Sequence, residues 1–352
     1  MPRVKAVLFP LRSASLWPSK ALPSYLSRMD EAINGRIAAL KEKYAASGQE
    51  LLDFLDGLLE AEYLTYWDYI RLDSLLSLQQ PRTGHHDEPI FIMYHQITEL
   101  YFKLVLHELD PVVESGAASQ GVLMEAIRRA NRYFGALEHS FGVMVDGMDR
   151  TQFLRFRMAL IPASGFQSGQ YRMIEIASAK LNDLVHLDQR EQFQKETDVE
   201  TLMAHIYWLR GATLEQSGQK TLTLEQFEKQ YGEIFLKRAR KAQGNSIADQ
   251  AFQLLQSGEL QDDLRKELRA YDQYVNVLWP LQHYRSAVRY LAKQPSDARA
   301  TGGTNWQKYL PPRFQKRIFF PFLWSEAEQE EWGKSFVDRY VIGDYSQPNS
   351  LG

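Results

Sequence analysis

The sequence predicts an all-α fold, and three observations support this fold class. Apolar residues recur at the i, i+3, i+4, i+7 spacing of amphipathic helices through most of the chain. The sequence contains no alternating runs joined by the Asn-Gly or Asp-Gly turns of hairpins. Glycine and proline fall instead at breaks between helical patterns, such as Pro162-Ala163-Ser164-Gly165 and Thr301-Gly302-Gly303-Thr304. We therefore expect helices joined by turns.

The helical patterns group into one large domain. The chain has 352 residues, the length of about two average domains, but no internal repeat and no long linker divides it. We expect an N-terminal arm and leading helix over 1–45, a single helical-bundle domain over 46–345 and a frayed tail over 346–352. Polar stretches mark a small peripheral helical lobe over 187–270 within that domain.

The helices follow in chain order from their apolar spacing. One pattern covers 51–59, and a longer one covers 89–109, where we expect Asp87 as the N-cap and Pro89 in the first turn. Pro280 lacks a backbone donor and should kink or restart the last long helix. The remaining helical patterns lie around 120–142, 149–160, 167–184, 197–210, 223–242, 246–256, 260–293 and 325–338.

Composition excludes several classes of function. The content of 44% hydrophobic and 24% charged residues is that of an ordinary globular protein. A net charge of −3 gives no indication of nucleic acid as a partner. The absence of cysteine excludes disulfides, thiolate nucleophiles, cysteine-ligated zinc and iron–sulfur clusters. No apolar stretch approaches the ~18 residues that a membrane helix needs, so we expect no membrane partner.

The first 29 residues carry five basic and no acidic side chains, as transit peptides do. Four prolines interrupt any long amphipathic helix there, and the apolar stretch 6–11 is shorter than the core of a signal peptide. We interpret the segment as a flexible arm of a cytoplasmic protein.

His95 lies on a helix face that also carries Phe91, Glu99 and Phe102, because residues four and seven positions apart stack on a helix. Spacing alone leaves two interpretations open: a core histidine that donates to a carbonyl, or a metal ligand paired with Glu99. No Glu-x-x-His occurs, so the signature of ferritin-like di-iron sites is absent. The cluster His85-His86-Asp87-Glu88 predicts a helix start with solvated histidines rather than a metal site.

His283 lies in an apolar helix with Arg285 and Arg289 on a neighbouring face. Such a histidine is commonly a core or surface residue, but it is also what a haem iron binds in a chain without cysteine. The arginines would then pair with propionates or simply solvate the helix. Arg157, flanked by apolar residues, is either paired internally or offered to a small carboxylate. Glycine-rich nucleotide loops and a G-x-S-x-G elbow are absent.

Three blocks of the chain resemble the tryptophan 2,3-dioxygenase family and follow the family's order. The Pro-Ala-Ser-Gly-Phe-Gln-Ser run and the helix with the His-Gln pair are specific, whereas Thr-Gly-Gly-Thr alone would be weak evidence. The blocks are Leu64-Thr65-Tyr66-Trp67-Asp68-Tyr69-Ile70-Arg71-Leu72-Asp73 with His86-Asp87-Glu88-Pro89-Ile90-Phe91-Ile92-Met93-Tyr94-His95-Gln96, then Phe153-Leu154-Arg155-Phe156-Arg157 with Pro162-Ala163-Ser164-Gly165-Phe166-Gln167-Ser168, then His283-Tyr284-Arg285 with Thr301-Gly302-Gly303-Thr304.

The resemblance implies a haem b between the helices, with ferrous iron held axially by His283. It implies that Ser164 lies close to the bound oxygen and the haem edge, and we take Arg285 as a further cofactor-binding residue. It also implies a homotetramer in which Tyr66 and Tyr69 enter the site of a neighbouring subunit.

The resemblance also implies how L-tryptophan is bound. His95 matches the histidine that hydrogen-bonds the indole N–H, and Arg157 matches the arginine that holds the carboxylate. Thr301 matches a threonine that contacts the carboxylate and the ammonium group. Phe91 matches an aromatic wall of the indole pocket, and Phe153 stands at a substrate-side position where many members have tyrosine.

Two further positions depart from the family pattern. Pro280 stands where the family has an ordinary helix former, and Asn305-Trp306 replaces a common Ser-Gly after the glycine turn. The sequence therefore predicts a cytoplasmic haem dioxygenase that converts L-tryptophan and O₂ to N-formyl-L-kynurenine in tryptophan degradation, the kynurenine pathway. The alternatives are a related haem oxygenase that acts on another aromatic or modified tryptophan, and a non-catalytic haem or tryptophan sensor.

Overall fold

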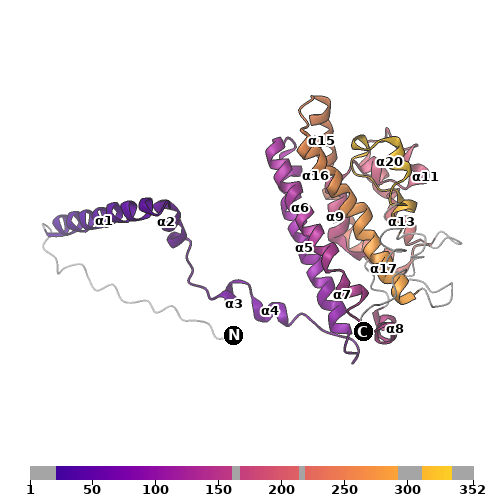
Figure 1. Cartoon of the computed structure of the whole chain (residues 1–352), viewed down its shortest axis with the longest axis horizontal. Helices are drawn as coiled ribbons and strands as arrows, with labels where there is room; N and C mark the ends of the chain where they lie inside the picture. The colour runs from indigo at the N-terminus through magenta and orange to yellow at the C-terminus, as the bar shows by residue number, and fades with distance from the viewer. Residues whose placement is uncertain (1–20, 161–166, 214–218, 292–310, 335–352) are drawn as a thin grey trace, which may run out of the picture. The chain divides into compact units, whose positions relative to one another are not determined.

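The computed structural model describes residues 21–160, 167–213, 219–291 and 311–334, which form helices joined by turns (Figure 1). Within these ranges no strand forms, and isolated bridges join only Val185 to Ile206 and Thr213 to Lys220. The prediction of an all-α fold is confirmed. No helix in this part of the chain is long and apolar enough to cross a membrane. The chain divides into two compact units, 1–78 and 79–352.

The first unit contains four described helices: α1 (Ala21–Ala46), α2 (Leu51–Leu59), α3 (Tyr66–Tyr69) and α4 (Leu72–Leu76). α1 and α2 pack together through the rings of Tyr44 and Phe54, whose centroids lie 4.2 Å apart. The helix predicted over 51–59 forms as α2, but Leu52, Leu58 and Leu59 stay exposed. Apart from Leu51, which is buried, most of the apolar face that predicts this helix is therefore exposed.

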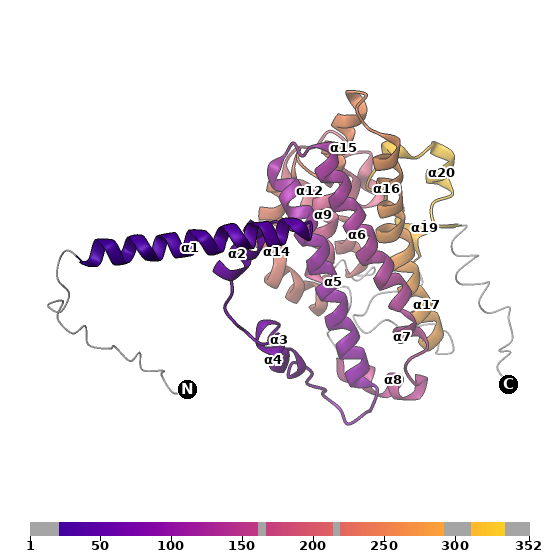
Figure 2. The same cartoon turned by 60° about the vertical axis from the view of Figure 1, so that its left-hand side comes forward.

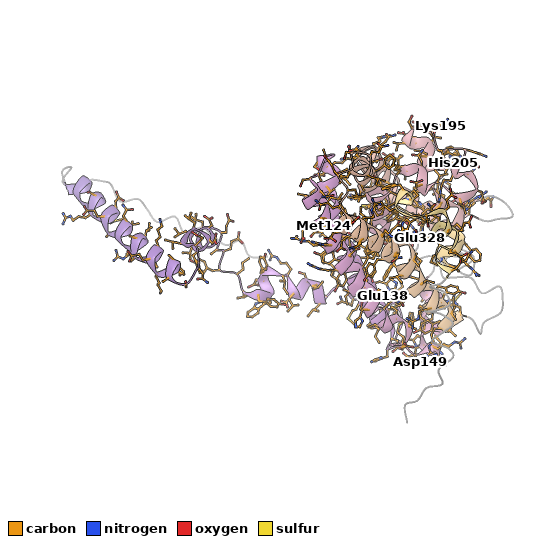
Figure 3. All side chains as sticks on the ribbon, turned by 45° about the horizontal axis from the view of Figure 1, so that its top comes forward. Met124, Glu138, Asp149, Lys195, His205 and Glu328 are labelled. Carbon is orange, nitrogen blue, oxygen red and sulfur yellow. The ribbon has the colours of Figure 1, made fainter. Side chains whose placement is uncertain are left out.

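The second unit is built around two long neighbouring helices, α5 (Glu88–Ser115) and α6 (Gln120–Ser140), which lie side by side in both views (Figures 1 and 2). Phe102, Leu106 and Leu109 are buried on the inner face of α5. Asp87 occupies the N-cap position, but its side chain makes no capping hydrogen bond. Its carboxylate instead accepts from the Asp149 N–H at 2.6 Å (Asp149 is labelled in Figure 3).

A second group of helices packs on α5 and α6. α9 (Gly169–Ser178) packs against both α5 and α14 (Leu222–Ala242), and α16 (Asp262–Gln273) packs against α6. α16 continues through a π-helical turn, η3 (Tyr274–Leu278), directly into α17 (Trp279–Leu291). The expected kink or restart of the last long helix at Pro280 stays a prediction, because the helix changes from π to α one residue before this proline without a break.

The remaining elements are short and connect or cover the long helices. The helices predicted over 167–184 and 197–210 are each interrupted, since the backbone turns extended at Ala179 and Ile206. The division between a bundle and a lobe at 187–270 stays a prediction. These elements are α7 (Gly142–Val145), α8 (Arg150–Phe156), η1 (Arg157–Leu160), α10 (Leu181–Leu184), α11 (Leu187–Arg190), α12 (Val199–Ala204), α13 (Tyr207–Gly211), α15 (Ile247–Gln256), α19 (Pro312–Gln315), η4 (Pro321–Leu323) and α20 (Glu326–Glu330).

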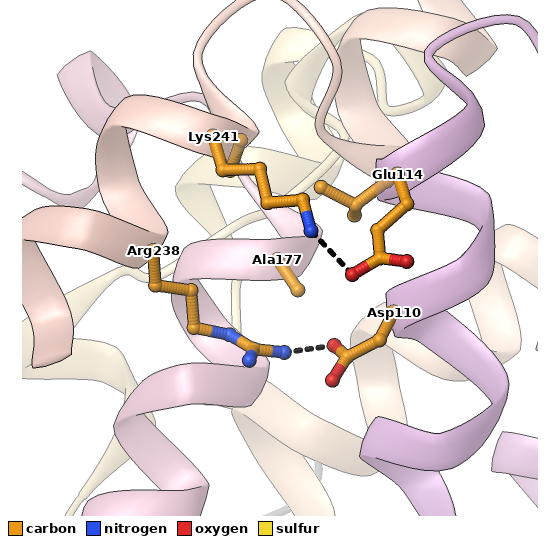
Figure 4. A pocket seen from close by; sticks show the side chains of 7 residues that line it. Asp110, Glu114, Ala177, Arg238 and Lys241 are labelled. Carbon is orange, nitrogen blue, oxygen red and sulfur yellow. Dashed lines mark hydrogen bonds and ion pairs between the residues drawn. The ribbon is translucent and has the colours of Figure 1, made fainter.

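Two ion pairs join α5 to α14 across a small hollow (Figure 4). Arg238 of α14 pairs with Asp110 of α5, and Lys241 pairs with Glu114 one turn further along. Ala177 of α9 also lines this hollow. Both acids therefore have basic partners within the contact between the two helices.

Candidate functional site

Two histidines from different long helices, His95 on α5 and His283 on α17, form the centre of the candidate site. Both side chains keep part of their surface accessible, yet burial lowers the pKa of each ring, and that of His283 falls to about 4. The charge that His95 would carry lowers the pKa of His283 further, so the two rings lie within electrostatic reach of each other. Both imidazoles are therefore neutral at pH 7.

The same local contact orients both rings. Nδ1 of His95 lies 2.7 Å from the carbonyl oxygen of Phe91, and Nδ1 of His283 lies 3.0 Å from the carbonyl oxygen of Trp279. A carbonyl can only accept, so Nδ1 of each neutral ring carries the proton and donates. Each Nε2 then keeps its lone pair, free to accept a hydrogen bond or to bind a metal.

Aromatic rings form a wall beside His95. The ring of Phe91 lies 4.1 Å from the imidazole centroid, and the rings of Phe153 and Phe156 lie 6.3 Å and 5.8 Å from that of Phe91. Tyr290 of α17 packs on Phe153 at 4.5 Å. α5, α8 and α17 thus contribute to one apolar wall, which suits a flat aromatic ligand.

Two aromatic rings pack against the imidazole of His283. Trp279 meets the imidazole edge-on at 4.6 Å, and Phe141 lies 4.8 Å away. Trp279 and Phe141 are themselves 6% and 3% exposed and touch each other at 5.3 Å. Because its neighbours are fixed in the core, His283 is held in one orientation.

Two arginines lie on the elements that carry this site. Arg157 begins η1 directly after the buried Phe156, and partial burial lowers the pKa of its guanidinium, which stays charged. Arg285 donates to Gln282 at 3.1 Å, and Gln282 in turn donates to Glu138 of α6 at 2.9 Å (Glu138 is labelled in Figure 3).

Glu99 is engaged by a neighbouring helix. Its side-chain and backbone oxygens both accept from Gln170 of α9 at 2.8 Å. In the part of the chain that the structure describes, no group of three or more His, Cys, Asp or Glu side chains could hold a metal ion. The metal interpretation of the His95–Glu99 pair therefore finds no support. At the helix start predicted to carry solvated histidines, the side chain of His86 is 87% exposed, whereas His85 is only partly exposed.

The residues present fit the haem that the resemblance implies. A neutral imidazole with a free Nε2, a water-poor aromatic setting and a nearby arginine are what a histidine-ligated porphyrin needs. This fit rests on His283, Trp279, Phe141 and Arg285.

Several predicted site residues stay predictions. Ser164, Thr301 and Asn305-Trp306 lie outside the described residues. Tyr66 and Tyr69 lie on α3 in the first unit, where their side chains are 70% and 76% exposed. Their place near an indole pocket stays a prediction.

Sequence reasoning missed several residues that shape the site. Phe141, Phe156 and Tyr290 lie on elements other than α5, so no spacing along one helix indicates their contacts. The hydrogen bonds from the two histidines to the carbonyls of Phe91 and Trp279 are predictable from sequence, because each carbonyl lies four residues before its histidine on the same helix.

Comparison with known proteins gives the family. The sequence model of the tryptophan 2,3-dioxygenase family matches residues 57–295. A tryptophan 2,3-dioxygenase from a Polaromonas species is 30% identical over 275 residues, which cover 74% of this chain and 86% of that protein. One from a Ruegeria species is 30% identical over 287 residues, with 75% and 92% covered. One from Bacillus thuringiensis is 29% identical over 273 residues, with 75% and 92% covered. The chain therefore belongs to the tryptophan 2,3-dioxygenase family of oxidoreductases.

Proposed function

We propose that this chain holds a haem b on Nε2 of His283 and opens the indole ring of L-tryptophan beside it. The observation that carries this proposal is the pair of neutral imidazoles, His95 and His283. Each Nδ1 is engaged by the carbonyl four residues earlier, so each Nε2 is available at the same site.

Membership of the family makes this chain a tryptophan-cleaving dioxygenase. The reaction breaks the C2–C3 bond of the indole and places both atoms of O₂ in N-formyl-L-kynurenine. The match over most of the chain does not favour a different aromatic substrate or a sensor role.

A bound haem would supply a ferrous iron that binds O₂. We propose that His283 would hold this iron, because the low pKa of the ring keeps Nε2 unprotonated at neutral pH. Arg285 is on the same helix two residues later, and we propose that its guanidinium pairs with a haem propionate. Ser164 is proposed at the haem edge on the strength of the resemblance.

The residues proposed for the substrate bind and orient it. Nε2 of His95 accepts the indole N–H, because Nδ1 of that ring already donates to Phe91. The fork of Arg157 holds the carboxylate with two parallel hydrogen bonds, together with Thr301. The rings of Phe91 and Phe153 form an apolar wall for the indole and exclude water. Fixing indole C2–C3 beside the oxygen is the main contribution of the protein, and it needs no strong base.

The assembly is also part of the proposal. We propose a homotetramer in which Tyr66 and Tyr69 of one chain complete the indole pocket of another, and a cytoplasmic location. The exposure of both tyrosines and of the apolar face of α2 supports a role for the first unit between subunits.

The first experiment is turnover by the haem-loaded, anaerobically reduced protein given L-tryptophan and ¹⁸O₂. We expect a product that carries both labelled oxygen atoms, identified by mass spectrometry. His283→Ala should lose the histidine-type haem spectrum, whereas His139→Ala, an exposed histidine on α6, should keep it. Haem binding without a doubly labelled product would contradict the activity, and an unchanged spectrum in His283→Ala would contradict the ligand.

A further inference from the structure

The π-helical turn before His283 leaves one buried carbonyl without its expected backbone donor. In η3 the N–H of Trp279 donates to the carbonyl of Tyr274, five residues earlier. In the same register the N–H of residue 280 would donate to the carbonyl of Val275. Residue 280 is proline and has no N–H. Val275 is fully buried, so solvent cannot replace this donor.

Tyr171 of α9 supplies a hydrogen bond at this carbonyl. Its hydroxyl lies 2.9 Å from the carbonyl oxygen of Val275, and the tyrosine is 8% exposed. Arg317 donates from Nη1 to the same hydroxyl at 3.2 Å. Because a guanidinium cannot accept, the hydroxyl proton must point away from Arg317 and toward Val275. Burial raises the pKa of Tyr171, which keeps the proton on the hydroxyl.

A buried charge cluster holds Arg317 in this position. Glu175, which has no exposed surface, pairs with both Arg317 and Arg172. The hydroxyl of Tyr207 accepts from each arginine at 2.6 Å and donates to Glu175. The members pair with one another in the core, so the cluster is a rigid base for Tyr171 rather than a binding site.

The carbonyl held by Tyr171 lies four residues before Trp279, whose own carbonyl orients His283. The ring of Phe102 contacts both Tyr171 and Trp279, at 5.5 Å and 5.6 Å, and so joins them from the α5 side. We infer that Tyr171 is a positioning residue for His283: its hydroxyl replaces the N–H that Pro280 lacks and so fixes the turn that sets the tautomer and direction of the imidazole.

The role of His283 as a haem ligand rests on the proposed function, but the contact between Tyr171 and Val275 does not. A double-mutant cycle of Tyr171→Phe and Pro280→Ala tests it on the cofactor-free full-length protein. With Pro280 present, Tyr171→Phe should raise the urea-unfolding equilibrium constant about tenfold or more, because a buried carbonyl is left unpaired. In the Pro280→Ala background the new N–H can pair with a carbonyl of the turn, and the effect should largely vanish.

Tyr271→Phe is the matched control. Tyr271 is also a fully buried tyrosine of this core, but its hydroxyl bonds to Ser178 at 2.9 Å. We expect Tyr271→Phe to change the unfolding equilibrium constant by the same factor in the wild-type and the Pro280→Ala backgrounds. Equal costs of Tyr171→Phe in both backgrounds would overturn the inference, since Tyr171 would then be an ordinary core residue.

A second readout separates positioning from stability. ¹⁵N NMR of histidine-labelled, cofactor-free protein should show His283 as the Nδ1–H tautomer, assigned by its loss in His283→Gln. Tyr171→Phe should increase the Nε2–H fraction, and Pro280→Ala should restore the original state. In the ferrous haem-loaded protein the iron–histidine stretching band should shift and recover in parallel.

Energetic coupling without a change of tautomer would overturn the positioning role. A wild type that takes up no haem would contradict the proposed function alone, because the unfolding and NMR measurements would still decide on Tyr171.

Discussion

At the scale of single residues, the same local hydrogen bond orients both histidines of the candidate site. His95 and His283 each donate from Nδ1 to the carbonyl four residues earlier, although they lie on different helices and face different aromatic neighbours. This hydrogen bond is local, because positions i and i+4 of a helix are always close. The burial that lowers the pKa values of the rings also depends on residues distant in the sequence, such as Phe141 beside His283.

Arg157 gives the most direct test of substrate binding. We expect Arg157→Ala to raise KM for L-tryptophan and to lower kcat/KM by about 10²-fold or more, because removing a charged partner from a carboxylate costs ~2–5 kcal/mol. Steady-state kinetics measures the change. Arg155→Ala is the control, since Arg155 is exposed in the last turn of α8 and should keep wild-type kinetics. An unchanged KM in Arg157→Ala would remove this residue from the carboxylate.

At the scale of elements, the sequence predicted helix ends well where a side-chain cap marks them. α6, α14 and α15 begin within one residue of their predicted starts, and each has a Ser or Thr cap: Ser119, Thr221 and Ser246. The interruptions near Ala179 and Ile206 were not predicted. No proline or glycine marks them, and the hydrogen bond from His186 N–H to the His205 carbonyl forms only when distant segments meet.

In the candidate site, too, features set by contiguous sequence could be predicted, and contacts between distant segments could not. Its two histidines and Arg157 could be named from motifs and resemblance, because each motif is contiguous in the sequence. The rings of Phe141, Phe156 and Tyr290 could not, because their contacts join four separate elements. The π-helical register of η3 is a further case: Pro280 indicated a restart, but the donor that stabilises the turn lies 104 residues away on Tyr171.

The packing of α9 on α14 gives a prediction about an element. A Cβ at Gly169, the first residue of α9, would lie 2.5 Å from the ring of Tyr231 on α14. We expect Gly169→Ala to lower the free energy of unfolding by about 1–3 kcal/mol, because the two helices must separate or the ring must move. Urea unfolding measures the change.

Gly232, the residue after Tyr231, is the matched control. A Cβ there would meet no atom within 4 Å. Gly232→Ala should therefore stabilise α14 by up to about 1 kcal/mol through helix propensity. Destabilisation of both variants to the same extent would show that the helix contact is not the cause.

At the scale of the whole molecule, His283 couples stability to pH. Its pKa is about 4 in the folded, cofactor-free protein and about 6.5 in an unfolded chain. The unfolded state therefore binds more protons between these values. The contribution of neutral His283 to stability is complete above pH 6.5 and is lost as the pH falls toward 4, by up to about 3 kcal/mol.

Urea unfolding of wild type and His283→Gln between pH 4 and 7 checks the direction of this pH dependence. The difference in unfolding free energy between the two proteins should change steadily in favour of the variant as the pH falls. A difference that is constant across this range would show that the ring is solvated in the folded state.

A subunit-mixing experiment tests the proposed assembly. Tyr66→Ala and Arg157→Ala variants should each be nearly inactive alone. Co-expressed at equal levels, they should recover about a quarter of wild-type activity if Tyr66 acts in a neighbouring subunit, because a quarter of randomly paired sites then contain both intact residues. Activity no higher than that of the separate variants would place Tyr66 in its own chain's site or outside any site.

The proline at position 280 also has a consequence for the history of the sequence. By our inference the hydroxyl of Tyr171 is dispensable to the turn while residue 280 has an N–H, and it stabilises the turn once that residue is proline. We therefore expect a proline at 280 to be less costly to stability when tyrosine is already present at 171. With proline in place, loss of the tyrosine should cost more than it would without the proline. A single missing hydrogen atom on the backbone thus links the permitted substitutions of two helices that are distant in the sequence.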